Sequence, residues 1–146
     1  MASIKRSALV NHSAAAMYQL VNDVASYPQF MDGCRGVDII EHTDHRMVAE
    51  LQLKKAGVEV KFTTVNRLIP DASIEMRLQD GPFKHFKGLW QFSALTDSAS
   101  KVALDLEFEF SHRGMGALGA GLFSGIANNL VDALCKRADT ILEEGQ

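Results

Sequence analysis

Residues 102–110, Val-Ala-Leu-Asp-Leu-Glu-Phe-Glu-Phe, alternate without a break between large apolar side chains and small or acidic ones. Successive side chains of a β-strand point to opposite faces of a sheet, so this run predicts a strand with one apolar face and one solvated face. The carboxylates of Asp105, Glu107 and Glu109 share the solvated face. We interpret them as a row of solvated charges, because a catalytic carboxyl group needs surroundings that shift its pKa.

The same period-two alternation runs upstream through most of the chain. The predicted strands are 3–11, 37–40, 47–54, 58–64, 74–79 and 86–92. The predicted turns are 43–45, 56–57, 70–71 and 80–82. Consecutive strands joined by short turns predict an antiparallel meander that is apolar on one face and wet on the other.

Two helices complete the predicted fold. Ser13 can cap a helix over 14–24, and Tyr27-Pro28 would break it because proline disfavours helical geometry in the residue before it. Apolar side chains recur at helical spacing over 117–142, a helix of roughly 39 Å at about 1.5 Å per residue. We therefore predict a single α+β domain, 1–146, in which a curved antiparallel sheet wraps around a long C-terminal helix.

The apolar face of the sheet predicts a cavity. A twisted sheet curls away from a straight helix, which leaves a gap for side chains or for a ligand. An ordinary packed core is the alternative to a ligand site. The candidate ligand-binding residues are Phe62, Met76, Leu78, Phe86, Trp90, Phe92, Leu106, Phe108, Phe123, Ile126 and Leu130.

The chain has 146 residues and a formal net charge of −3, which argues against a general nucleic-acid binder and against a DNA partner. The middle of the chain is nevertheless locally basic. Its lysines are Lys54, Lys55, Lys61, Lys84 and Lys87. Such a stretch would favour an anionic membrane or an RNA surface, although these charges are more often simply solubilising.

The sequence also predicts where the protein works. The N-terminus lacks the apolar core of a signal peptide, and we expect no segment long and apolar enough to span a membrane. Cys34 and Cys135 lie far apart and are interpreted as free thiols in a reducing compartment. We expect a cytoplasmic protein with at most peripheral or transient contact with a membrane surface.

A glycine-rich segment precedes the long helix. Gly114–Gly119 matches the G-x-G-x-x-G pattern, but no strand follows to complete a βαβ unit, so we reject a dinucleotide site. Gly119, Gly121 and Gly125 weaken the first helical turns. Two alternatives stay open for 114–125: a loose lid over the cavity, or close packing of helix on sheet that requires small residues.

No residue pattern supports catalysis or metal binding. His42, Asp44 and His45 lie at a predicted turn without a fourth ligand. His12, His85 and His112 are isolated, and no serine or cysteine lies in a nucleophile motif. We expect neither a metal site nor an enzyme.

Five pieces of the chain resemble the coenzyme Q-binding START-domain family. They are Leu20–Cys34, Asp80–Phe83, Gly88–Phe92, Phe108–Ser111 and Arg137-Ala138. The resemblance covers nearly the whole chain and implies the helix-grip fold of START and Bet v 1-like proteins, with a hydrophobic tunnel. The family-motif residues near the cavity mouth would be Tyr27, Pro28, Phe30, Gly81, Pro82 and Phe83.

The resemblance also implies function. Relatives are described as polyketide cyclases or lipid transport proteins, and bacterial members include the ribosome association toxin type. The first hypothesis is a non-catalytic carrier of a hydrophobic ligand, ubiquinone before others, that supports respiration and requires no cofactor beyond the bound isoprenoid quinone or similar lipid. The alternative is a toxin-like protein that binds the large ribosomal subunit and blocks subunit association. A cyclase-like enzyme ranks last, because no base faces the inner side convincingly.

Overall fold

The computed structural model describes residues 2–111 and 116–144. The elements are β1 (Ala2–Val10), α1 (Ala14–Asn22), the 3-10 helix η1 (Val24–Gln29), β2 (Cys34–His42), β3 (Arg46–Lys55), β4 (Val58–Ile69), β5 (Ser73–Asp80), β6 (Phe83–Thr96), β7 (Ala99–Phe110) and α2 (Gly116–Glu144). All seven strands form one sheet in the order β1-β7-β6-β5-β4-β3-β2, and every neighbouring pair is antiparallel.

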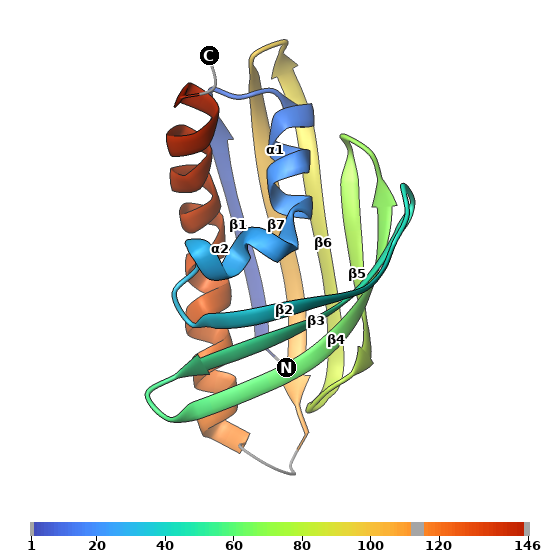
Figure 1. Cartoon of the computed structure of the whole chain (residues 1–146), viewed down its shortest axis with the longest axis vertical. Coiled ribbons are helices and arrows are strands. Elements are labelled where there is room, and N and C mark those ends of the chain that lie inside the picture. The colour runs from blue at the N-terminus through green and yellow to red at the C-terminus, as the bar shows by residue number, and fades with distance from the viewer. Residues whose placement is uncertain (1, 112–115, 145–146) are drawn as a thin grey trace.

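The sheet curves around α2, as Figure 1 shows. Strands β2 to β7 follow one another as a meander, and β1 joins the far edge by pairing with β7. Because β1 and β2 lie at opposite edges, α1 and η1 must cross the concave side between them. The predicted α+β helix-grip fold is confirmed, and the concave face of the sheet and α2 enclose the core.

The strands extend beyond the ends predicted from alternation. The prediction ended one strand at residue 64, whereas β4 continues to Ile69 because Val65 pairs with Arg77 and Ile69 pairs with Ser73 on β5. The extension adds Asn66 and Leu68 to the buried, inward-facing row of β4. Alternation alone missed them because a polar asparagine interrupts the apolar pattern.

The first helix begins where the sequence predicts and ends earlier. The Ala16 N–H donates to Ser13 Oγ at 3.1 Å, which confirms the predicted cap. The helix stops at Asn22 rather than at 24, and Pro28 lies within η1 instead of ending α1. The hydroxyl of Tyr27 donates to the carbonyl oxygen of Val21, so the Tyr27 side chain satisfies a free carbonyl at the end of α1.

Aromatic side chains fill the space between the sheet and α2 at the end where α2 starts. The rings of Phe62, Phe83, Phe86, Phe108 and Phe123 contact one another, mostly edge to face, and Phe110 joins them through Phe83. This geometry is favourable for aromatic pairs beyond the area they bury. We call these six residues the phenylalanine cluster.

Helix α2 does not meet the expectation that no segment is long and apolar enough to span a membrane. By length and composition alone, Leu118–Leu142 could cross a bilayer, contrary to the sequence prediction. This is weak evidence for a span, because a helix in the core of a soluble protein passes the same test, and α2 packs against the concave sheet face. The predicted lid segment 114–125 lies partly outside the described residues, and its described part is helical from Gly116.

Candidate functional site

A small cavity lies between the sheet and α2. Its volume is about 80 Å³. Ligand pockets usually measure roughly 300–1,000 Å³, so side chains occupy most of the predicted gap in this conformation. The cavity is lined mainly by aliphatic and aromatic side chains from α1, η1, the strands β3 to β7 and α2.

The structure brings most of the predicted ligand-binding residues to this cavity. Those that line it are Phe62, Met76, Phe86, Trp90, Leu106, Phe123, Ile126 and Leu130. Leu78, Phe92 and Phe108 are not among the lining residues. Phe108 belongs to the phenylalanine cluster, and Phe92 packs between Trp90 and Tyr18. A shared sheet face therefore does not guarantee contact with the cavity.

Three polar residues that the sequence interpretation did not select also line the cavity. They are Asn22, Thr64 and Asn66. The Oδ1 atoms of Asn22 and Asn66 are buried and accept no hydrogen bond within the described part of the chain. A buried polar atom without a partner is rare in proteins and calls for an explanation. The sequence did carry a signal for Asn66: it lies two residues beyond Thr64 and therefore on the same inward row of β4.

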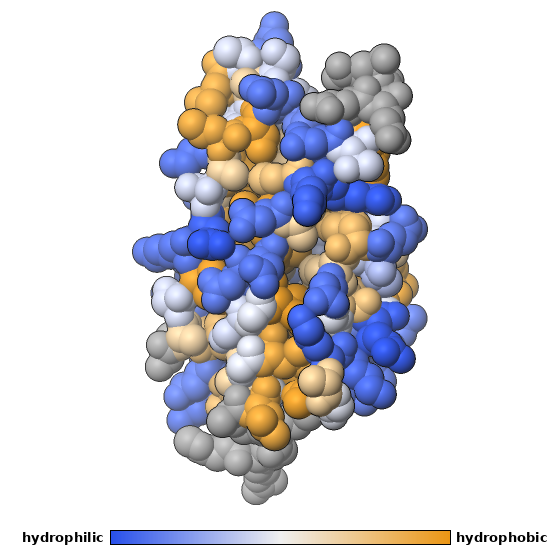
Figure 2. All heavy atoms as spheres, turned by 90° about the vertical axis from the view of Figure 1, so that its left-hand side faces the viewer, coloured by the Kyte–Doolittle hydropathy of each residue, from blue (hydrophilic) through white to orange (hydrophobic). Residues whose placement is uncertain are grey.

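A larger groove lies outside the cavity, along α2. It measures about 880 Å³ and runs between α2, the loop after η1 and the end of β3. Met31 and Ile126 line both the groove and the inner cavity, so these two side chains form the wall between them. Figure 2 looks onto this side of the molecule, where apolar side chains reach the surface between charged ones.

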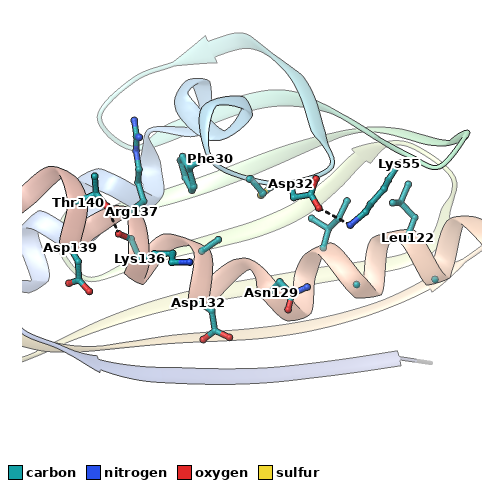
Figure 3. A pocket seen from close by; sticks show the side chains of 15 residues that line it. Phe30, Asp32, Lys55, Leu122, Asn129, Asp132, Lys136, Arg137, Asp139 and Thr140 are labelled. Atoms are coloured by element: carbon teal, nitrogen blue, oxygen red, sulfur yellow. Dashed lines mark hydrogen bonds and ion pairs between the residues drawn. The ribbon is translucent and has the colours of Figure 1, made fainter.

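Charged and aromatic side chains hold the rim of the groove, as Figure 3 shows. Lys55 Nζ donates to Asp32 Oδ2 at 2.7 Å, and this hydrogen bond lowers the pKa of Asp32. Arg137 donates to Gln29 Oε1 at 3.0 Å and lies 5.2 Å from the centre of the Phe30 ring. Asp132 and Asp139 point away from Phe30 and Asp32. These contacts join the η1–β2 loop to β3 and α2.

The six motif residues have different places. Tyr27 lines the inner cavity, and Phe30 lines the outer groove. Phe83 is part of the phenylalanine cluster, Pro28 is exposed in η1, and the Pro82 carbonyl accepts the Ser111 N–H at 2.8 Å. Gly81 has φ +146°, and a Cβ there would lie 2.6 Å from Phe62 Cβ, so only glycine fits this turn without strain.

The inner cavity offers little for acid–base chemistry. Tyr27 is its one titratable lining residue. Burial raises the pKa of Tyr27, so its hydroxyl stays protonated and engaged with Val21. Among the described residues, no three His, Cys, Asp or Glu side chains lie together as a metal site would need.

The locally basic stretch is largely neutralised by neighbouring acids. Lys55 pairs with Asp32, and Lys61 Nζ lies 3.6 Å from Glu50 Oε1. Lys54 lies opposite Glu59, and Lys87 lies opposite Glu107 across the sheet ladders. These lysines therefore do not form a continuous basic surface.

Comparisons with known proteins identify relatives of this chain over most of its length. A protein of Vibrio cholerae serotype O1 named ribosome association toxin RatA is 44% identical over 144 residues, which cover 99% of this chain and 100% of that protein. The mitochondrial coenzyme Q-binding protein COQ10 of Drosophila melanogaster is 24% identical over 133 residues, 90% of this chain and 52% of that protein.

The crystal structure of the ZhuI aromatase/cyclase from Streptomyces sp. R1128 has the same fold. It superposes with a TM-score of 0.78 at 19% sequence identity, covering 94% of this chain and 93% of that one. The family model described as polyketide cyclase / dehydrase and lipid transport matches residues 10–135. The chain belongs to this family of polyketide cyclases, dehydrases and lipid transport proteins, as its sequence motifs indicated.

Proposed function

We propose that the protein binds a hydrophobic ligand between the sheet and α2 and acts as a carrier without catalysing a reaction, with ubiquinone or a similar isoprenoid quinone as the ligand. The apolar cavity, separated from the outer groove by the side chains of Met31 and Ile126, is the observation behind this proposal. The family description, which includes lipid transport, and the likeness to a coenzyme Q-binding protein support it.

The absence of an available base in the described cavity lining favours a carrier over a cyclase. Tyr27 is the one titratable lining group, and its hydroxyl already donates to a backbone carbonyl. The inner cavity is also too small for a quinone head group with its tail in the present arrangement. Binding would therefore require Met31, Ile126 and their neighbours to move apart.

The first test uses the only tryptophan of the chain, Trp90, which lines the cavity. Titration with decylubiquinone, a short-tailed quinone, is expected to quench Trp90 fluorescence and to reach saturation, because a quinone bound beside the indole quenches it efficiently. Ala127→Leu would fill part of the cavity and should weaken binding about 10-fold or more.

Ala120→Leu is the matched control, since Ala120 lies on the same helix and lines neither the cavity nor the groove. Its quenching curve should match that of the unmodified protein. Quenching that rises linearly with quinone concentration, as for free tryptophan, would contradict the carrier proposal.

A second candidate function is binding to the large ribosomal subunit so that subunit association is blocked. The observation that favours it is the 44% identity, over nearly the whole chain, to proteins named ribosome association toxins. If the lysines of the middle of the chain contact ribosomal RNA, Lys84 is the best placed, because within residues 2–111 and 116–144 it neither forms an ion pair nor lies opposite an acid in the sheet register.

Sedimentation with purified bacterial large subunits tests this candidate. We expect the protein to co-sediment at low salt and to dissociate as salt rises, because each phosphate contact releases counterions. Lys84→Glu should weaken binding at least about 10-fold, since the replaced contact also becomes repulsive. Lys101→Glu, on β7 near the turn that joins it to β6, is the charge-matched control. Failure to co-sediment at any salt concentration would argue strongly against this role.

A further inference from the structure

The inner cavity contains polar side chains that its own walls do not satisfy. Asn66 is 5% exposed and lies on the inward row of β4 beside Thr64. Its Oδ1 atom, like that of Asn22, is buried without a partner in the described chain. Apart from Thr64 and Tyr27, the remaining lining is apolar, and the Tyr27 hydroxyl is already bound to Val21.

We infer that the cavity binds its ligand by a neutral hydroxyl end group that donates a hydrogen bond to the unpartnered Oδ1 atom of Asn66 or Asn22, while the apolar tail leaves past Met31 and Ile126 into the outer groove. This inference rests on the proposed ligand binding and adds the chemical class and the orientation of the ligand.

The end group must be neutral because of what lines the cavity. A carboxylate or phosphate buried there would lose its hydration, and no lysine, arginine or histidine lines the described cavity to compensate for it. The unpartnered Oδ1 atoms are acceptors, so the end group must also carry a hydrogen to donate, as a hydroxyl does. Long-chain alcohols and the quinol form of a quinone fit this requirement, and fatty acids in their ionised form do not.

The orientation follows from where the polar groups and the wall lie. Asn22, Thr64 and Asn66 line the inner cavity and not the groove. The groove is lined by apolar groups, including Phe30 and Leu122, next to its charged rim. Its length along α2 offers a place for a tail that the 80 Å³ cavity cannot contain. The wall between the two spaces consists of Met31 and Ile126, whose side chains can change rotamer.

The experiment compares matched ten-carbon probes by their ability to displace decylubiquinone, with Trp90 fluorescence as the readout. In the unmodified protein, 1-decanol should displace the quinone at concentrations at least about 10-fold lower than decanoate at neutral pH. Asn66→Leu should weaken the binding of 1-decanol about 10-fold, because it removes an acceptor for the alcohol hydroxyl. Asn22→Leu serves as a second variant if Asn66→Leu does not fold.

Thr63→Val is the control, because Thr63 is a buried neighbour on β4 that does not line the cavity. It should leave the affinity for 1-decanol unchanged. Thermal unfolding adds a second readout. Asn66→Leu removes an unsatisfied buried group, so the melting temperature should rise while the binding of 1-decanol weakens. If Asn66 had a purely structural role, the melting temperature would fall instead.

The outcomes distinguish failure of the proposed ligand binding from failure of the inferred role of Asn66 and Asn22. If no probe binds the unmodified protein, the proposed function and this inference both fail. If the probes bind, but decanoate competes as well as decanol or both asparagine variants bind 1-decanol normally, hydrophobic ligand binding stands and the inference is overturned. The second pattern would assign the asparagine oxygens to internal water.

Discussion

Phe83→Ala is expected to lower the free energy of unfolding by about 3–5 kcal/mol, the usual cost of removing a large buried aromatic side chain. Phe83 is 7% exposed, and its ring lies 4.5 Å from that of Phe110, 5.0 Å from that of Phe123 and 5.1 Å from that of Phe86, measured between centroids. Alanine would leave a hole among rings that come from β4, β6, β7 and α2. Urea unfolding followed by far-ultraviolet circular dichroism measures the loss.

Phe30→Ala provides the matched control. Phe30 is another phenylalanine of the family motifs, but it lies half-buried in the groove, where it contacts Tyr27 and Arg137. The same substitution there should cost less than about 2 kcal/mol, because solvent can fill the space. Equal losses for the two variants would show that Phe83 does not anchor the phenylalanine cluster.

The sequence predicted the fold well because period-two alternation is a strong signal wherever one sheet face is buried. The run 102–110 and its upstream counterparts predicted the antiparallel meander, and apolar residues at helical spacing over 117–142 predicted the long C-terminal helix. Strand ends were harder to predict. Residues 65–69 belong to β4 because they pair with β5, and such pairing is not visible in the alternation of one segment. The end of α1 depends likewise on a contact, between Tyr27 and Val21.

The candidate site was predicted in part, for a related reason. Alternation identifies which side chains face inward but not how far each lies from the centre of the layer. Phe108 and Trp90 face the same side, yet Phe108 packs into the phenylalanine cluster whereas Trp90 lines the cavity. Asn66 was missed because an apolar pattern selects against a polar residue on a buried row. The outer groove depends on how a loop lies against α2, which no local pattern encodes.

Gly121→Ala combined with Gly125→Ala is expected to raise the free energy of unfolding by about 2 kcal/mol. Glycine in a helix interior costs about 1 kcal/mol relative to alanine, and a Cβ at either position would meet nothing within 4 Å. This space argues against the alternative that close packing on the sheet requires these two glycines. Gly33→Ala is the contrasting variant, because a Cβ there would lie 2.6 Å from Ile126 Cδ1 at a φ of +93°, and it should be destabilising.

The two glycines therefore weaken α2 at positions where packing does not require them, and both line the outer groove. The remaining physical consequence of having no side chain at these positions is free space in the groove.

Gly125→Leu tests whether the ligand enters through this space, because leucine favours a helix nearly as well as alanine but projects a large side chain into the groove. We expect stability to rise as for alanine, while stopped-flow quenching of Trp90 by decylubiquinone slows about 10-fold or more because the path past Met31 and Ile126 is obstructed. Gly125→Ala should take up the quinone at nearly the original rate. Equal uptake rates for the alanine and leucine variants would mean that the ligand reaches the cavity by another path. The groove would then not be the entrance, even if the ligand binds in the cavity.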